Sequence, residues 1–367
     1  MTPPELHLVV PGPLDQRTGG YIYDRRIVEG LRNLGRPVQV HSLEGRFPGP
    51  DPGAERALDG VLSGLSDASV VVIDGLALGG LPGPATRHAD RLTLLALVHH
   101  PLCEETGIPP QRATELKALE RAALQSCQGI IATSRFTADR LREWLQPSPP
   151  LRVVIPGVAR GTAGTGASTK RATAFIPSRS TKRAPVPLLL CVGSLIPRKG
   201  QDLLVRALAQ LRDRPWHCLL AGSDTRDPVF AQQLRAQITH LELDTRIEIL
   251  GECPEQALQE LYRRADVFVL PAWYEGYGMA FTEAMAHGLP VIATTGGAIP
   301  HTVPAAAGIL VAPGDSDRLA EALGRLLEEP SLQARLAEGA WAHARSLPGW
   351  EQASAQFAAA VKELAAT

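Results

Sequence analysis

The stretch "DVFVLPAWYEGYGMAFTEAMAHGLPVIATTGG" (266–297) decides the fold of the second half of this 367-residue chain. It begins with a continuous apolar run, passes through a glycine-rich loop and becomes helical near Gly278. It then returns to a second apolar run, "PVIATT". Continuous apolar strands separated by helices indicate a parallel sheet covered on both faces. The stretch therefore predicts one strand–helix–strand unit of such a sheet.

The same alternation extends along most of the chain. In the second half the further strand candidates are "PLLLCVGS", "WHCLLAGS", "RIEILG" and "AAGILV". In the first half they are "LHLVV", "VQVHSL", "SVVVIDG", "LTLLALVHH", "GIIATS" and "LRVVIPGV". Helical patterns lie between them, for example 21–34 and 110–126. The sequence therefore predicts an α/β protein with two doubly wound, Rossmann-like domains in tandem.

Domain boundaries follow from changes in composition. We expect an N-terminal domain over 1–158 and a C-terminal domain over 188–347. Residues 159–187 between them are rich in Gly, Ser, Thr and Pro and carry six basic residues, which favours a solvated linker over a basic binding patch. Residues 348–367 form an amphipathic closing helix, expected to pack back on the N-terminal domain.

Composition narrows the function. The 37 Lys and Arg against 38 Asp and Glu give a net charge of −1, which argues against a nucleic-acid-binding protein. The five cysteines are scattered without a Cys-x-x-Cys pair, which favours free thiols in a reducing cytoplasm. We expect no signal peptide and no membrane span, so that any membrane contact is peripheral, at the inner face of a membrane.

Two carboxylates stand out in the opening stretch. Glu275 lies in the glycine-rich loop that follows a strand, and Glu283 lies inside the helix after it. A carboxylate accepts paired hydrogen bonds from vicinal hydroxyls, and a nucleotide sugar has two such pairs, on the sugar and on the ribose. The free amides of the helix N-terminus would hold the phosphates between them. Helix capping by Glu275 and a surface position for Glu283 are the simpler alternative, but they leave the many glycines unexplained.

Other motifs also follow strands. "VGSLIPRKG" (192–200) brings Arg198 and Lys199 to a strand-to-helix junction, where fixed cations suit a departing diphosphate. "RTGGYIYD" (17–24) places Gly19 and Gly20 before a helix. "ALVHHP" ends a strand with His99 and His100, and because strand side chains alternate in direction, we expect one of the two to face the ligand.

The motif "DSD" (315–317) looks like the Asp-x-Asp that holds a divalent ion in many sugar transferases. It opens an amphipathic helix, "RLAEALGRLLEE", so helix capping by Asp315 or Ser316 explains it better. We therefore predict no metal site there.

Together these motifs resemble the retaining GT-B glycosyltransferases of family four, the glycosyl transferases group 1. The Glu-x7-Glu segment from Glu275 to Glu283 carries most of the likeness, supported by "VGSLIPRKG", "TGGY" and "VHH". The resemblance runs over nearly the whole chain except the linker. It implies two Rossmann-like domains facing across a cleft, with the C-terminal domain holding a nucleotide sugar.

The resemblance also implies roles for individual residues. Glu283 would bind the ribose and Glu275 the transferred sugar, Arg198 and Lys199 would neutralise the diphosphate, and His99, with His100 as second choice, would contact the sugar. The remaining donor-binding residues implied are Gly19, Gly20, Gly222, Glu252, Cys253, Gly276, Gly278, Met279 and Ala280. The catalytic set is His99, Arg198, Lys199 and Glu275.

For such an enzyme the resemblance implies no metal and no cofactor, with the nucleotide diphosphate sugar as a UDP- or GDP-type donor substrate. The hexosyl group would move with retention to a hydroxyl of a glycan, lipid or small-molecule acceptor. Two positions depart from the family pattern. Ser194 stands where an arginine is common, and His301 stands where an acid is common. They leave the donor open.

Two other functions remain open on the same residues. A sugar-nucleotide 2-epimerase would place acid and base carboxylates around the sugar ring, and a catalytically silent protein would bind the nucleotide sugar without turnover. An NAD-dependent dehydrogenase is disfavoured because no Gly-x-Gly-x-x-Gly follows the first strand.

Overall fold

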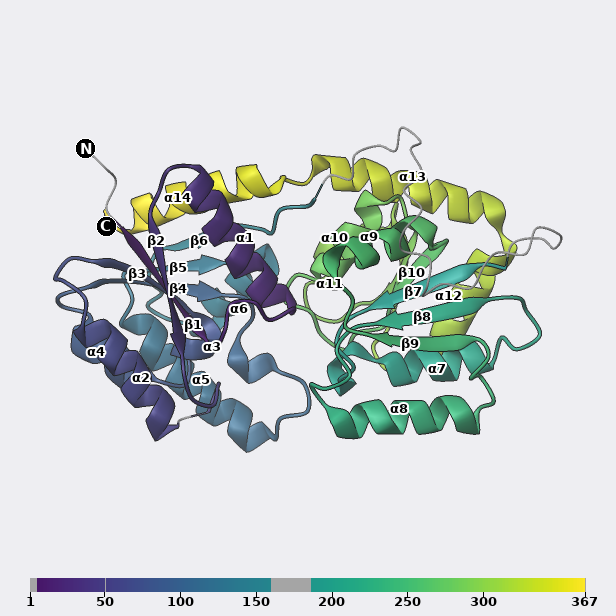
Figure 1. The fold of residues 1–367 in the computed structure, drawn as a ribbon, viewed down its shortest axis with the longest axis horizontal. Coiled ribbons are helices and arrows are strands. Elements are labelled where there is room, and N and C mark those ends of the chain that lie inside the picture. Colours follow the sequence, from purple (N-terminus) through teal and green to yellow (C-terminus); the bar gives the residue numbers. More distant parts are fainter. Residues whose placement is uncertain (1–4, 50, 160–185, 367) are drawn as a thin grey trace. The chain divides into compact units, whose positions relative to one another are not determined.

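The computed structural model describes residues 5–49, 51–159 and 186–366. The chain divides into two compact units (Figure 1). Unit 1 comprises residues 1–157 and 348–367, and unit 2 comprises residues 158–347. Most of the 159–187 linker, including its Lys170, Arg171, Lys182 and Arg183, lies outside the described residues.

Unit 1 is built on a six-stranded parallel sheet with the order β2-β1-β3-β4-β5-β6. All six strands predicted for the first half are confirmed. They are β1 (Leu6–Pro11), β2 (Val38–Leu43), β3 (Val70–Asp74), β4 (Thr93–Val98), β5 (Gly129–Ala132) and β6 (Leu151–Val153). Strands β1 and β5 are buried along their whole length and β4 along all but its first residue, which explains why they are continuously apolar.

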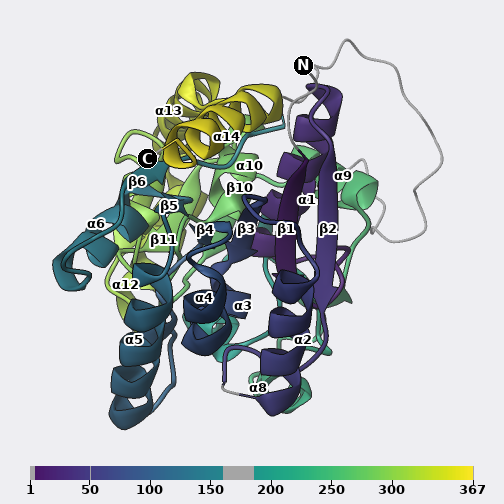
Figure 2. The same cartoon turned by 90° about the vertical axis from the view of Figure 1, so that its left-hand side faces the viewer.

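Helices cover both faces of this sheet. They are α1 (Gly19–Asn33), α2 (Pro52–Ser63), α3 (Gly75–Leu78), α4 (Pro82–His88), the 3-10 turn η1 (Leu102–Glu104), α5 (Pro110–Gln125), α6 (Arg135–Trp144) and α14 (Trp350–Leu364). Figure 1 shows α1 and α14 on one face. Figure 2 shows α2, α4 and α5 together on the other.

The helix α14 belongs to unit 1 because small and aromatic residues let it lie closely against α1. A Cβ atom on Gly30 would stand 1.9 Å from the hydroxyl oxygen of Ser354, so no larger residue fits at this crossing. Phe357 is buried, and its ring lies edge-on to that of Tyr23. The far end of the chain therefore completes the core of the first unit.

Unit 2 repeats the scheme with the order β12-β11-β10-β7-β8-β9, all parallel. The six predicted strands are again confirmed. They are β7 (Leu188–Val192), β8 (His217–Ala221), β9 (Ile247–Gly251), β10 (Val267–Leu270), β11 (Val291–Thr294) and β12 (Gly308–Val311).

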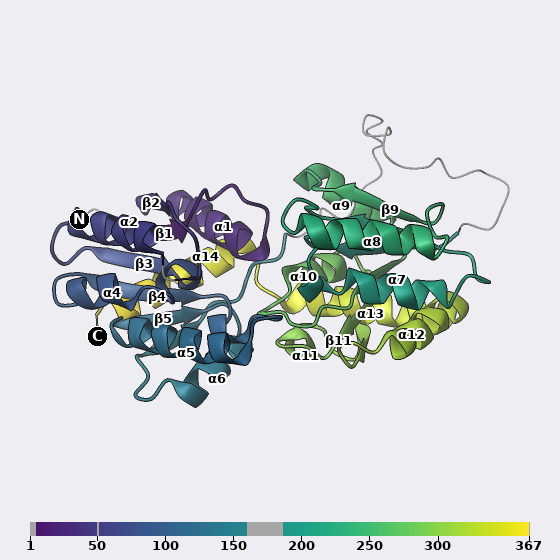
Figure 3. The ribbon, with the colours of Figure 1, turned by 90° about the horizontal axis from the view of Figure 1, so that it is seen from below.

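The helices of unit 2 also form two layers. They are the 3-10 turn η2 (Pro197–Lys199), α7 (Gln201–Ala209), α8 (Pro228–His240), α9 (Glu255–Arg264), α10 (Met279–Ala286), α11 (Ile299–Thr302), α12 (Ser316–Glu328) and α13 (Pro330–Ser346). Figure 3 shows α7 between α8 and α12 on one face, while α10 and α13 pack together on the other. Because every strand runs the same way, the loops that follow β7, β8, β9 and β10 gather at one edge of the sheet.

Across the described residues, no helix is both long enough and apolar enough to cross a membrane. All five cysteines are free thiols, as expected from their spacing.

Candidate active site

Glu275 meets both cations of the β7 loop at the carboxyl edge of the unit 2 sheet. The Lys199 ammonium forms an ion pair with Glu275 Oε1, and Arg198 Nη1 lies 3.9 Å from Glu275 Oε2. All three side chains are at most 19% exposed. Residues 76 positions apart in the chain thus form one charged cluster between two strand ends.

The backbone fixes Arg198 and Lys199 in this place. Gly200 has a left-handed φ of +67°, and a Cβ atom there would lie 2.2 Å from the carbonyl oxygen of Pro271. Beside this contact, the Trp273 amide donates a hydrogen bond to the Arg198 carbonyl at 2.8 Å. Arg198 Nη1 in turn donates to the Tyr274 carbonyl at 3.0 Å. Only glycine allows the β7 loop to approach the β10 loop this closely.

The glycines at the end of the opening stretch hold the Glu275 loop from its other side. Gly297 has a φ of +59°, and a Cβ atom there would lie 2.5 Å from the Glu275 carbonyl oxygen. The Ala298 amide donates to that same carbonyl at 2.8 Å. Gly296 approaches the Trp273 carbonyl with similar closeness. Gly296 and Gly297 therefore let the backbone pack closely against the Glu275 loop, which explains why two glycines stand together here.

Glu283 is held by two residues that the sequence interpretation missed. The buried Tyr262 hydroxyl, from α9, donates to Glu283 Oε2 at 3.0 Å. His287 stacks on the Tyr262 ring with centroids 5.2 Å apart, and its Nδ1 lies 2.8 Å from the Glu283 carbonyl. Burial raises the pKa of Tyr262 well above its usual range, and the Glu283 charge adds to this, so the hydroxyl keeps its proton. In the sequence, the only sign of this support was that an aromatic residue, Tyr262, stands three positions before "ADVFVL".

The other donor-binding residues predicted around Glu275 surround the start of α10. Gly276 and Gly278 lie in the loop, and Met279 and Ala280 form the first turn of the helix. Amides in a first turn have no acceptor within the helix, so they suit an anion. A Cβ atom on Gly278 would contact the Phe281 ring at 2.5 Å.

The strand ends of β8 and β9 carry the remaining predicted contacts of unit 2. The Gly222 amide donates to Gly251, and a Cβ atom on Gly222 would lie 2.0 Å from the Gly193 carbonyl oxygen. Glu252 and Cys253 follow β9 directly. Gln201, 1% exposed and not singled out from the sequence, donates to the Ser194 carbonyl at 3.0 Å and so holds the loop that carries Ser194.

In unit 1, Gly20 and His99 are neighbours. A Cβ atom on Gly20 would lie 3.3 Å from the His99 imidazole ring. Gly19 begins α1 beside it. His100 turns instead to Glu105, with Nε2 3.2 Å from Oε2. The two histidines do not alternate along a strand as expected, because β4 ends at Val98 and both lie in the bend that follows.

Two further motifs singled out in the sequence lie elsewhere in unit 2. Asp315 caps α12, and its carboxylate accepts from the Arg318 amide at 2.9 Å, so the capping prediction for "DSD" is confirmed. His301 lies exposed on α11, three residues after Ala298, whose amide donates to the Glu275 carbonyl.

An apolar hollow of about 360 Å³ in unit 1 lies where β1 and β3 begin. Doubly wound sheets bind ligands at the opposite edge.

Known proteins resemble the chain in these same regions. Residues 173–342 match the family model described as glycosyl transferases group 1. Among relatives, a GDP-mannose-dependent monoacylated alpha-(1-6)-phosphatidylinositol monomannoside mannosyltransferase of Corynebacterium glutamicum is 33% identical over 202 residues, 51% of this chain and 52% of the relative. A D-inositol 3-phosphate glycosyltransferase of Xylanimonas cellulosilytica is 32% identical over 240 residues, 64% and 57% of the two chains. The chain thus spans about half the length of the first relatives it matches.

The structural likeness extends over the whole chain. Sucrose-phosphate synthase from Thermosynechococcus elongatus superposes with a TM-score of 0.81 at 22% identity and covers 99% of both chains. HepE from Anabaena, in complex with UDP and glucose, has a TM-score of 0.71 at 19% identity, over 98% of this chain and 99% of its own. These likenesses show the fold, and the predicted GT-B type with two Rossmann-like domains is confirmed.

Proposed function

We propose that this protein is a glycosyltransferase that moves a hexosyl group from a nucleotide diphosphate sugar to a hydroxyl of an acceptor. The observation that carries the proposal is the cluster of Arg198, Lys199 and Glu275 at the carboxyl ends of β7 and β10, beside the first turn of α10. It lies inside residues 173–342, which match the family model described as glycosyl transferases group 1.

The cluster suits a departing diphosphate. As the bond to the sugar breaks, negative charge grows on the phosphate, and Lys199 and Arg198 are already fixed and largely excluded from water. Preorganised charge of this kind stabilises the transition state more than the ground state. Glu275 keeps the two cations in place and offers its carboxylate to the sugar hydroxyls, while Glu283, held by Tyr262, faces the ribose.

The proposal includes no metal. Two side-chain cations and the positive end of α10 supply the charge that a divalent ion would otherwise bring. It also includes retention by front-face attack, in which the departing phosphate oxygen takes the proton of the acceptor hydroxyl. The donor is of the UDP or GDP type, since relatives are named for GDP-mannose and a structural neighbour contains UDP. The acceptor is a glycan, lipid or small molecule, at the cytoplasmic side of the cell and with peripheral membrane contact where the acceptor is a lipid.

The test begins with the thermal unfolding midpoint of the protein in EDTA, measured against UDP-, GDP-, ADP- and TDP-sugars. We expect one nucleotide class to raise the midpoint, and the donor so found is then used at limiting acceptor to measure sugar transfer. Lys199→Gln should lower kcat about 100-fold or more, with a smaller change in donor Kd, because its charge matters most in the transition state. Lys117→Gln, on α5 of unit 1, is the matched control.

Full turnover by the Lys199 variant would remove the diphosphate assignment. A midpoint unchanged by every nucleotide sugar would overturn the proposal as a whole. Release of an epimerised nucleotide sugar without acceptor, or binding without any transfer, would replace it by the epimerase or by the silent binding protein.

A further inference from the structure

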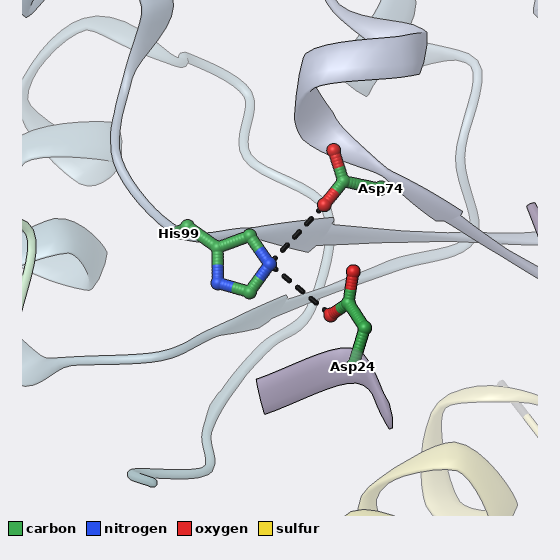
Figure 4. A group of neighbouring side chains, drawn as sticks. All are labelled: Asp24, Asp74 and His99. Carbon is green, nitrogen blue, oxygen red and sulfur yellow. Dashed lines mark hydrogen bonds and ion pairs between the residues drawn. The ribbon is translucent and has the colours of Figure 1, made fainter. Parts of the chain in front are cut away.

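Unit 1 contains a second charged cluster, centred on His99. His99 Nε2 lies 3.2 Å from Asp24 Oδ1 and 3.1 Å from Asp74 Oδ2 (Figure 4). The three residues come from α1, from the end of β3 and from the bend after β4. Asp24 is 1% exposed and Asp74 4%. A single ring nitrogen therefore meets two buried carboxylates.

The ring is fixed in this position from several sides. Gly20 lies against one face, and the Tyr23 ring meets His99 edge-on with centroids 5.5 Å apart. The His99 carbonyl accepts hydrogen bonds from the hydroxyls of Thr133 and Thr137, at 3.3 and 3.1 Å. In Figure 4 the other ring nitrogen, Nδ1, lies on the side away from both carboxylates. The imidazole therefore has one side bound to acids and the other turned away from them.

The charges decide the protonation of this ring. Two buried carboxylates without a cation would be strongly destabilising, whereas a protonated imidazole between them balances one full charge. The charged groups that face the ring are Asp24, from α1, and Asp74, from the end of β3. Tyr23 of α1 packs on the ring as well, but burial raises its pKa well above its usual range and it stays neutral. His100, the next residue, pairs with Glu105.

We propose that Asp24 and Asp74 are positioning residues that keep His99 as an imidazolium, with Nε2–H held between them and Nδ1–H offered as a fixed, charged donor to a ligand oxygen. His99 then donates a hydrogen bond and a positive charge, and it does not remove a proton from the acceptor. The identity of the ligand oxygen, an oxygen of the nucleotide sugar or of its acceptor, rests on the proposed function. The protonation of His99 does not.

The titration of the two partners agrees with this arrangement. Burial by itself lowers the pKa of His99, but the charges and hydrogen bonds of Asp24 and Asp74 outweigh it and raise that pKa to about 10. Burial raises the pKa of Asp24 to about 6 against the opposing effect of His99. At neutral pH the pair is therefore a carboxylate and an imidazolium.

The same three ligand atoms lie within 4.8 Å of one another, so a divalent metal in place of the shared proton is the competing interpretation. The two interpretations differ at Nε2. The proposed imidazolium carries a proton on that atom, and a metal would remove it.

The experiment reads the ring nitrogens directly, by NMR of the full-length protein labelled with 15N-histidine. The His99 signals are assigned by their loss in His99→Gln. After dialysis against EDTA, we expect both ring nitrogens to be protonated at pH 8.5 and the titration midpoint to lie well above pH 8. Asp24→Asn should lower that midpoint by at least one pH unit. Glu105→Gln, which alters the partner of His100 instead, should leave it unchanged.

Several outcomes would overturn the proposal. One is a neutral His99 at pH 8.5 in the unaltered protein. Another is an unchanged His99 midpoint in both Asp24→Asn and Asp74→Asn. Loss of the Nε2 proton signal on adding one equivalent of Zn²⁺ or Mn²⁺ would assign the cluster to a metal.

A second arm tests the ligand contact. In Asp24→Asn, kcat/KM for sugar transfer should fall as the pH passes the lowered His99 midpoint, whereas the loss in His99→Gln should not vary with pH. A flat profile in Asp24→Asn would overturn the donor role of Nδ1–H. Because the NMR arm needs no turnover, a failure of the proposed function would leave the protonation result standing.

Discussion

At the scale of single residues, the candidate site depends on side chains that hold other side chains. Lys199 and Arg198 are placed by Glu275, and Glu283 is placed by Tyr262 and His287. Such partners reduce the conformational freedom that a binding residue loses when the ligand arrives. The consequence can be measured at Tyr262, which lies behind Glu283.

Tyr262→Phe removes the hydrogen bond to Glu283 and leaves the ring in place. We expect it to lower the free energy of unfolding by about 1 kcal/mol and to weaken nucleoside diphosphate binding about 5- to 10-fold. Tyr23→Phe is matched to it, because that buried hydroxyl donates to the Val154 carbonyl in unit 1. The control should show the stability loss alone. Nucleotide affinity in Tyr262→Phe equal to that of the unaltered protein, measured by calorimetry, would remove Tyr262 from the site.

At the scale of elements, close backbone contact joins the loop after β7 to the loop after β10. Gly200 combines a left-handed φ with an approach of 2.2 Å between a built Cβ atom and the Pro271 carbonyl. Gly200→Ala should therefore destabilise unit 2 by about 2 kcal/mol or more and displace Lys199. Gly60→Ala in α2, where a built Cβ atom meets no described atom within 4 Å, should be neutral or stabilising by about 0.5–1 kcal/mol. Urea unfolding compares the two, and a stable Gly200→Ala with full activity would contradict this account.

The start of α12 provides a second test at this scale. Asp315→Ala removes the cap on the Arg318 amide and should lower stability by about 1 kcal/mol, whereas Asp315→Asn keeps a capping oxygen and should lower it much less. Both variants should transfer sugar normally in EDTA. Loss of activity in Asp315→Asn, restored by a divalent ion, would revive the metal interpretation of "DSD".

At the scale of the whole molecule, the buried carboxyl of Glu120 should make the stability of unit 1 depend on pH. Burial raises its pKa to about 8, although it accepts a hydrogen bond from the Leu102 amide at 3.0 Å. The folded-state pKa lies above the unfolded value near 4.5, so its contribution is complete below about pH 4.5 and is lost as the pH rises through 8. Unit 1 should therefore lose stability as the pH rises from about 4.5 to about 8, with no further loss from this group at higher pH.

Glu120→Gln should remove that loss, stabilising unit 1 by about 1–3 kcal/mol at pH 9 relative to the unaltered protein. Glu321→Gln, an exposed residue of α12, should leave the pH dependence unchanged. Amide hydrogen exchange, resolved by peptide, assigns the effect to unit 1. An identical pH dependence in the unaltered protein and in Glu120→Gln would show that Glu120 is not the group responsible.

Sequence and structure divide the explanation of this protein along physical lines. Both sheets could be predicted, because buried parallel strands are continuous apolar runs and their signal is local. The Asp315 cap and the start of α10 could be predicted for the same reason, since a helix begins with residues that are neighbours in the chain. Glu275, Arg198 and Lys199 could be singled out because they lie in segments that follow strands, and Glu283 because it lies in the helix that continues the Glu275 loop.

Other features depended on residues far apart in the chain. The pairing of Lys199 with Glu275, the support of Glu283 by Tyr262, and the meeting of Asp24, Asp74 and His99 join positions 21 to 76 residues apart. No local pattern marks such pairs, because the partners become neighbours only when the parallel strands align their carboxyl ends. The sequence by itself determined the architecture and the kinds of residue at the sheet edges. The tertiary structure decided which charges meet, and so which of them can be held ready for a ligand.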